Sequence, residues 1–159
     1  MAGGIRFIVD INVGKLTRWL RIMGYDALSF CGSDDGQMVA TALAEERVML
    51  TRDTQVMERR AVTGGRLKAI LIQSDKPEQQ IQQVGKALGL DFRFRPFTIC
   101  LECNKPLESR SKQEMQTRVP PYVFKTQHQY MECPGCHRVY WRGTHWEAMT
   151  RKLERLMEG

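Results

Sequence analysis

The chain has 159 residues, of which 42% are hydrophobic, and it carries a formal net charge of +6. This composition excludes a disordered chain, and no apolar stretch approaches the roughly 18 residues that a membrane-spanning helix needs. The length suits one ordinary domain with a small appendage. The N-terminus shows no signal-peptide pattern, so we expect a cytoplasmic protein, and the positive charge allows a polyanionic partner.

In the first half of the chain, short apolar strands alternate with helices. Leu16, Trp19, Leu20 and Met23 follow the spacing of one helix face, and Gly24 suits the end of that helix. We expect strands at 6–10, 26–30, 48–50 and 68–73, and helices from Leu16, over 35–46, after Asp53 and after Pro77. This order predicts an α/β fold with a mainly parallel sheet covered by helices on both faces.

The pattern changes at Phe94 to short strands, turns and two cysteine pairs. A last helix carries Trp146, Met149, Leu153 and Leu156 on one side. We therefore expect two units, 1–93 and 94–159, with the boundary in the segment 91–96.

Aspartates follow the expected strands of the first unit. Asp10 ends the first strand, Asp34 and Asp35 open the second helix, and Asp53 and Asp75 follow the third and fourth strands. Parallel strands present their carboxyl ends at one edge of the sheet, where α/β folds bind ligands. Converging carboxylates repel one another and need a cation, and oxygen-only ligands indicate Mg²⁺ or Mn²⁺. Such an ion can promote hydrolysis of a phosphate ester.

Each acid also has a structural interpretation. Aspartate at a helix start is a good N-cap, which would account for Asp34, Asp53 and Asp75. Asp10 is harder to explain in this way, because it lies within an apolar run where a charge is costly.

Basic residues lie near these acids. Lys15, Arg18 and Arg52 could neutralise the phosphates of a nucleic acid, although Lys15 and Arg18 could equally belong to a solvated helix face. For Arg21 we expect the solvated face.

Two C-x-x-C pairs, Cys100 with Cys103 and Cys133 with Cys136, have the spacing of a tetrahedral zinc site. Such a site would be structural, since four thiolates leave no open position. Disulfides, a thioredoxin-like redox site and an iron–sulfur cluster are the alternatives. The nearby aromatic residues could pack around the metal or stack on unpaired bases together with Arg138, Arg142 and His145; these aromatic residues are Tyr140, Trp141 and Trp146.

The runs FIVDINVGKLTRWLRIMGYDAL, SDDGQMVATALAEERVMLTRD and ILIQSDKPEQQ resemble the RNase domain at the C-terminus of the Mut-seven exonuclease, a PIN-like family. The segments CLECNKPLESRSKQEMQTRVPPYVF and CPGCHRVYWRGTHWEAMTRKL resemble the zinc ribbon that follows it. The resemblance covers about residues 5–155. It implies a PIN-like nuclease domain over 1–93 and a zinc ribbon with a terminal helix over 94–159.

By position, the resemblance implies that Asp10, Asp35 and Asp53 hold the catalytic metal, with Asp34 as a neighbour in reserve and Asp75 as a fourth acid. The four cysteines match the ribbon's zinc ligands. The chain contains no exonuclease domain, so the resemblance does not say whether a regulatory or recruiting protein brings it to RNA.

The sequence thus favours a Mg²⁺- or Mn²⁺-dependent ribonuclease of endonucleolytic type, with RNA as the partner. The alternative is a non-catalytic zinc-ribbon protein that binds RNA or the ribosome and retains a vestigial acidic site. A phosphatase is disfavoured, because haloacid-type phosphatases carry Asp-x-Asp where this chain has Asp10-Ile11-Asn12.

Overall fold

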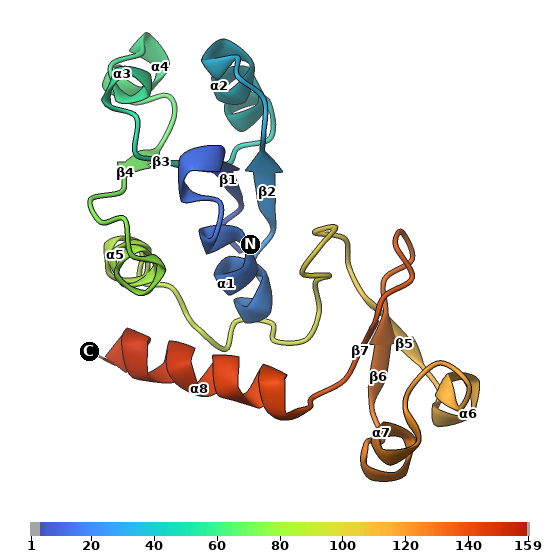
Figure 1. Ribbon diagram of the computed structural model, residues 1–159. Coiled ribbons are helices and arrows are strands. Elements are labelled where there is room, and N and C mark those ends of the chain that lie inside the picture. Colours follow the sequence, from blue (N-terminus) through green and yellow to red (C-terminus); the bar gives the residue numbers. More distant parts are fainter. Residues whose placement is uncertain (1–3, 159) are drawn as a thin grey trace.

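The computed structural model describes residues 4–158, and its core is a parallel sheet (Figure 1). The four strands lie in the order β2-β1-β3-β4, with all three neighbouring pairs parallel. Their bounds are β1 Phe7–Asp10, β2 Ala27–Phe30, β3 Val48–Thr51 and β4 Ala69–Leu71. The predicted α/β class and parallel sheet are confirmed.

Helices cover both faces of the sheet, because alternate residues of each strand point to opposite sides. Phe7 and Val9 belong to the larger core cluster, which includes residues of α1 and α5, whereas Ile8 packs with α2, α3 and α4. The bounds are α1 Leu16–Met23, α2 Asp35–Ala44, α3 Thr54–Met57, α4 Arg60–Thr63 and α5 Pro77–Leu88, with the 3₁₀ turn η1 Ile11–Val13 between β1 and α1.

The end of α1 is fixed by Gly24, as its sequence position predicts. Gly24 has φ of 95°, a left-handed conformation that glycine adopts readily. A Cβ atom there would also collide with the Arg95 carbonyl. The close approach of residue 95 brings the start of the C-terminal unit against α1.

The C-terminal unit holds a three-stranded antiparallel sheet in the order β5-β6-β7. Its elements are β5 Glu108–Arg110, α6 Lys112–Met115, α7 Pro121–Thr126, β6 Tyr130–Glu132 and β7 Val139–Tyr140. The sequence did not predict α6 and α7. They enclose a small core of Met115, Val119, Val123 and Tyr130. This part of the C-terminal unit, residues 94–143, is called the ribbon below. It has apolar packing of its own, next to the cysteines.

The last helix, α8 Thr144–Glu158, returns to the N-terminal unit and packs against α5 (Figure 1). Trp146 and Leu153 are buried in the same core cluster as Phe7 and Val9. The ring of Trp146 meets Phe97 edge-on, with centroids 4.9 Å apart. The main core therefore contains residues from both sides of the predicted boundary, which itself stays a prediction. None of the helices within residues 4–158 is long and apolar enough to cross a membrane.

Candidate functional site: an acidic sheet edge and a four-cysteine centre

The strand order places a topological switch point between β1 and β3. The chain leaves β1 for β2 on one side and returns to β3 on the other side. In open α/β sheets, ligands bind outside the carboxyl ends of the strands at such a point. Asp10 is the last residue of β1, and Asp53 follows the end of β3 by two residues.

Asp10 is buried, with 6% of its surface exposed. Its Oδ1 accepts a hydrogen bond from the Ile11 N–H at 2.8 Å, and its Oδ2 accepts one from the Thr51 hydroxyl at 2.7 Å. The Thr51 Oγ1 in turn accepts from the Asp53 N–H at 3.0 Å. No ion pair within residues 4–158 involves Asp10, so only neutral groups support this carboxylate.

Three of the candidate acids cap helices: Asp10 is the N-cap of the 3₁₀ turn η1 through its bond with the Ile11 N–H, and two others cap α-helices. Asp34 accepts from the Gln37 N–H at the start of α2, and Asp53 accepts from the Gln55 N–H at the start of α3. Asp35 is half-buried in the first turn of α2. The capping interpretation therefore holds for Asp34 and Asp53, and each cap occupies one of the two carboxylate oxygens.

Asp75 does not cap α5. The N-cap residue there is Lys76, which makes no side-chain cap, and the Lys76 N–H donates to the Ser74 hydroxyl instead. Asp75 is exposed and lines a cavity of about 380 Å³ together with Asn12, Lys15 and Gln80. Gln80 Oε1 is the one buried side-chain polar atom among the described residues without a hydrogen-bond partner. An unsatisfied acceptor is therefore found beside the carboxyl edge of the sheet.

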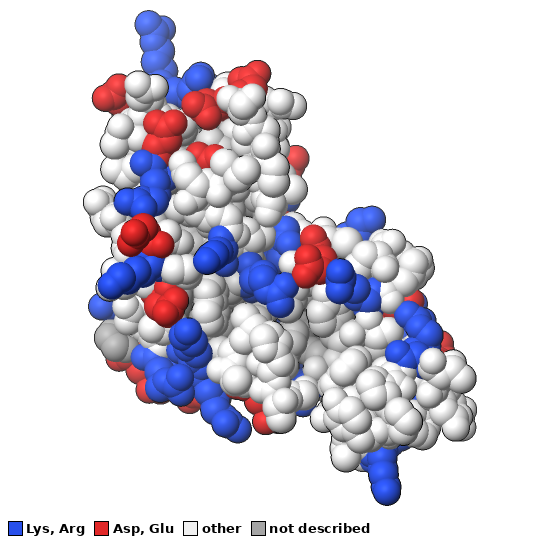
Figure 2. Space-filling model, viewed as in Figure 1, with Lys and Arg blue, Asp and Glu red and all other residues white. Residues whose placement is uncertain are grey.

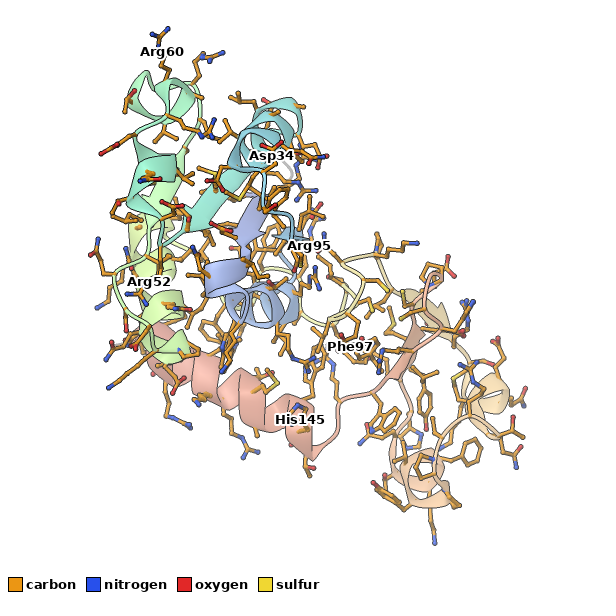
Figure 3. All side chains as sticks on the ribbon, turned by 45° about the horizontal axis from the view of Figure 1, so that its top comes forward. Asp34, Arg52, Arg60, Arg95, Phe97 and His145 are labelled. Carbon is orange, nitrogen blue, oxygen red and sulfur yellow. The ribbon has the colours of Figure 1, made fainter. Side chains whose placement is uncertain are left out.

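The acids share one edge without forming a compact metal cage. Within residues 4–158, the group of metal-ligating side chains whose ligand atoms come within 4.8 Å of one another consists of the four cysteines. Asp10, Asp35 and Asp53 are not part of such a group. Figure 3 shows Asp34 on the α2 side of this edge and Arg52 on the side toward α5.

The basic candidate residues differ in whether they form ion pairs. Lys15 and Arg52 are exposed and enter no ion pair in the described part of the chain. The Arg52 backbone N–H donates to Asn12 Oδ1 at 3.2 Å, which ties the β3–α3 turn to η1. Arg18 pairs with Glu102 of the ribbon at 2.9 Å.

The cysteines form a centre with tetrahedral spacing. All four Sγ atoms lie within 4.8 Å of one another, and those of Cys100 and Cys136 are 3.7 Å apart. Zinc at about 2.3 Å from each of four sulfurs places them about 3.8 Å apart, so the centre fits a metal of this kind. All four thiols are free, and 3.7 Å is far longer than a disulfide bond of about 2.05 Å.

The two turns that present the thiols have the same local structure. Asn104 N–H donates to the Cys100 carbonyl, and His137 N–H donates to the Cys133 carbonyl. The residue after each C-x-x-C, Asn104 or His137, has φ of 63° or 64°. This repeated left-handed turn aims both thiol pairs at one point.

Hydrogen bonds shift the pKa values of two of the thiols, Cys133 and Cys103. Burial alone would raise the pKa of Cys133, but backbone N–H groups of Cys136 and Gly135 lower it to about 7. A hydrogen bond with Cys136 raises the pKa of Cys103 to about 12. The Cys133 thiol is therefore readily ionised, while Cys103 holds its proton until a metal replaces it.

Tyr140 supports the same centre. Its hydroxyl lies 3.2 Å from Cys100 Sγ and accepts from the Leu101 N–H at 3.2 Å. Because the Tyr140 hydroxyl oxygen already accepts from the Leu101 N–H, the hydroxyl proton is available to Cys100 Sγ. Burial, followed by this contact, raises the pKa of Tyr140. A tyrosine held protonated can donate to a metal-bound thiolate.

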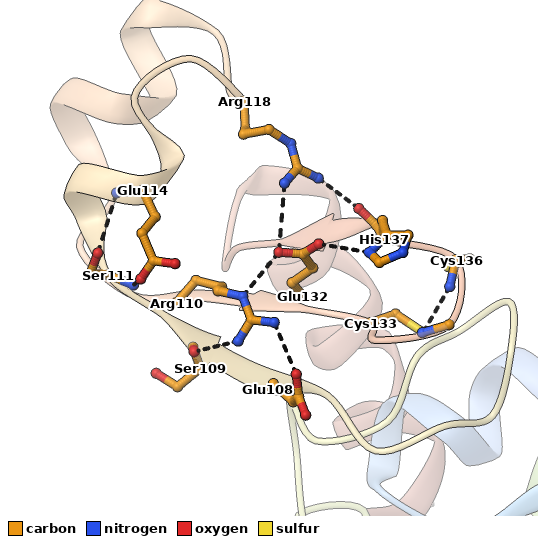
Figure 4. Close-up of polar contacts among 11 residues, drawn as sticks. Glu108, Ser109, Arg110, Ser111, Glu114, Arg118, Glu132, Cys133, Cys136 and His137 are labelled. Carbon is orange, nitrogen blue, oxygen red and sulfur yellow. Dashed lines mark hydrogen bonds and ion pairs between the residues drawn. The ribbon is translucent and has the colours of Figure 1, made fainter.

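Glu132 forms a network of ion pairs in the ribbon beside Cys133 (Figure 4). The carboxylate is buried and contacts Arg110 at 3.0 Å, Arg118 at 3.6 Å and His137 Nδ1 at 3.1 Å. The hydrogen bond with His137 lowers the pKa of Glu132; burial opposes this effect, and Arg110 reinforces it. The network ties β5, β6 and the second cysteine turn together.

Sequence reasoning missed how the ribbon joins the sheet, and our expectation of a solvated Arg21 was wrong. Arg21 is 6% exposed and donates twice to the Ala27 carbonyl and once to the Leu101 carbonyl. Ala27 N–H donates to Asn104 Oδ1. Ala27 lies on the edge strand β2, so Arg21 and Asn104 satisfy backbone groups that an edge would otherwise leave unpaired. No helical periodicity distinguishes such an arginine from an exposed one.

Comparison with known proteins identifies the family. The model of the Mut7-C RNAse domain family matches residues 5–153, nearly the whole chain. No curated protein and no solved structure matches. The match spans the parallel sheet, the acidic edge and the four-cysteine ribbon together. The chain belongs to the Mut7-C RNAse domain family.

Proposed function

We propose that the protein is a ribonuclease that uses Mg²⁺ or Mn²⁺ at the carboxyl edge of the sheet. The observation that carries the proposal is Asp10, a buried carboxylate at the switch point with no cationic partner within residues 4–158. A buried carboxylate is costly unless it is paired or ligates a metal. Membership of an RNAse family supports hydrolysis of RNA as the reaction.

Asp10, Asp35 and Asp53 would hold the ion. Their oxygen-only donor set fits a hard divalent cation. When bound, such an ion supplies Lewis acidity toward a phosphoryl oxygen and lowers the pKa of a water molecule. Thr51 would keep Asp10 in place by its 2.7 Å hydrogen bond and, through its contact with the Asp53 N–H, would fix the spacing of the two acids.

Other residues of the edge would position the RNA. Lys15 and Arg52 would bind phosphates, since both are exposed and unpaired in the described chain. Asp34 would remain a cap, because its side chain holds the first turn of α2. Asp75 would add a negative charge from the neighbouring cavity, outside the set of acids that hold the ion.

The four cysteines would hold a structural zinc ion. Their spacing supports zinc, and a site with four thiolates has no open position for a substrate. Zinc binding would stabilise the ribbon, whose own apolar core is small.

Cleavage of RNA by the zinc-loaded protein, with and without Mg²⁺ or Mn²⁺, tests the proposal. We expect the reaction to require the divalent ion and Asp10→Asn to abolish it, because asparagine keeps the size of the side chain and one acceptor oxygen but loses the charge. Asp91→Asn is the matched control, since Asp91 is exposed and follows the C-terminal end of α5, whereas Asp75 and the acidic edge lie at the N-terminal end of that helix. RNA binding without cleavage by wild-type protein in any divalent ion would favour the non-catalytic RNA-binding alternative.

A further inference from the structure

A groove lies where the ribbon meets the N-terminal unit. It consists of two cavities, of about 420 Å³ and 540 Å³, which share Arg18, Leu101, Val139, Tyr140 and Trp141 in their walls. We call this the junction groove. It is built from the first cysteine turn, β7, α7 and the start of α8, and the N-terminal unit contributes Arg18 of α1 to its wall.

We propose that the junction groove binds an unpaired stretch of RNA, with Tyr122 and Trp141 as stacking surfaces and Arg138 as a phosphate contact. This inference rests on the proposed function, because the bound strand would be the substrate whose cleavage occurs at the acidic edge.

Aromatic side chains in the groove are available for stacking. Tyr122, in the first turn of α7, is 71% exposed, and only it and Ile11 are exposed large hydrophobic residues in the described chain. Trp141 packs against the small ribbon core and also lines both cavities. Bases stack on such rings with little dependence on sequence, and proteins recognise single-stranded RNA mainly in this way.

The charge of the groove favours a polyanion. Arg18, Arg118 and Arg138 lie in its walls, and Glu102 is the single acid among the lining residues. Glu102 is already paired with Arg18, and Arg118 contacts Glu132. Arg138 is exposed and forms no ion pair within residues 4–158, so its charge is free for a phosphate.

The groove is connected to the acidic edge along α1. Lys15, which precedes α1, lines the cavity that contains Asp75, and Arg18 lines the junction groove. Residues three apart at a helix start are neighbours on its surface, about 5–6 Å apart at Cβ. Figure 2 shows Lys and Arg side chains gathered over α1, between the N-terminal unit and the ribbon. Figure 3 places His145 at the end of α8 that faces the ribbon. One strand could therefore follow basic residues from the groove to the acids.

The test measures binding of fluorescent single-stranded RNA, about 4–16 nucleotides long, to the zinc-loaded full chain without Mg²⁺ or Mn²⁺. We expect Tyr122→Ala to weaken binding about 5- to 150-fold, the range that loss of one stacking partner gives. Arg138→Ala should weaken it less and reduce the slope of log affinity against log salt by about 0.7. Arg60→Ala is the matched control: Arg60 is also exposed but lies on α4, far from the groove (Figure 3), and should bind as wild type.

Trp141→Leu gives a second measurement, because leucine keeps apolar packing against the ribbon core but cannot stack on a base. Its circular dichroism and zinc content must match wild type. Wild-type affinity in Tyr122→Ala, Arg138→Ala and Trp141→Leu would overturn the inference, and so would equal affinity for a duplex of the same sequence.

The two proposals fail in different ways. Metal-dependent cleavage that is lost in Asp10→Asn but unaffected by the groove variants would refute the groove and leave the ribonuclease. Binding through the groove without cleavage in any divalent ion would refute the ribonuclease and leave the groove.

Discussion

Arg21 offers a sharp test of how the two units depend on each other. Its guanidinium makes hydrogen bonds of 2.7 Å to the Leu101 carbonyl and of 2.8 and 3.0 Å to the Ala27 carbonyl. Arg21→Met keeps a long apolar side chain but leaves both carbonyls without this donor. Each buried unsatisfied acceptor costs about 1–3 kcal/mol, and relief from burying a charge offsets part of that cost. We expect a loss of about 2–4 kcal/mol.

Urea unfolding followed by circular dichroism gives this free energy. Arg21→Lys should recover about half of the loss, because an ammonium group keeps the charge but cannot reach both carbonyls in the guanidinium's fork geometry. A colorimetric chelator should also remove zinc faster from Arg21→Met. Burial lowers the pKa of Arg21 and Cys100 opposes this effect, and the Leu101 carbonyl that Arg21 binds belongs to the first cysteine turn. A loss below about 0.5 kcal/mol, or lysine no better than methionine, would refute this account of the junction.

Three further outcomes follow from the ribbon. Removal of zinc with a chelator should unfold residues 94–143 ahead of the sheet, which amide hydrogen exchange would detect; unchanged protection would contradict a structural metal. Tyr140→Phe should weaken zinc binding about 10-fold, because the thiolate of Cys100 loses its donor; competition with a chelator measures this. Glu132→Gln should cost about 1–3 kcal/mol at neutral pH, since its arginine partners lose their counter-charge. The folded-state pKa of Glu132 is depressed, so its contribution is present above the ordinary value of 4.5 and is lost as the pH falls through the depressed one. Urea unfolding should therefore show wild type and Glu132→Gln converging below pH 4.5, and a constant difference would be inconsistent with this pairing.

The alternation of strands and helices was readable from the sequence because it depends on local periodicity. Each strand of the sheet is short and apolar, and Gly24 ends α1 at the expected residue. Helices α6 and α7 were not predicted, because their few apolar residues, such as Met115 and Val123, gain partners only once the ribbon closes on them.

The four-cysteine centre was predictable because two fixed spacings bring four thiols to one point. The acids were harder. Strand order places Asp10 and Asp53 at the same edge, yet whether a carboxylate caps a helix or faces a neighbour depends on side-chain rotation. The structure shows the cap of Asp53 and the burial of Asp10, and neither appears in a sequence pattern.

The partners of Arg21 and Asn104 lie beyond the reach of sequence patterns altogether. Leu101 is 80 residues from Arg21, and Asp26 is 78 residues from Asn104. Such contacts are set by how one unit docks on the other, and the same docking brings Arg18 of α1 to the junction groove.

Electron paramagnetic resonance of Mn²⁺ added to the zinc-loaded protein tests most directly whether acids distant in sequence meet at the sheet edge to capture a hard cation. We expect saturable binding to the wild-type chain, loss of that binding in Asp10→Asn and in Asp53→Asn, and wild-type behaviour in Asp91→Asn. Mn²⁺ binding of equal strength in wild type and Asp10→Asn would contradict the proposed catalytic site.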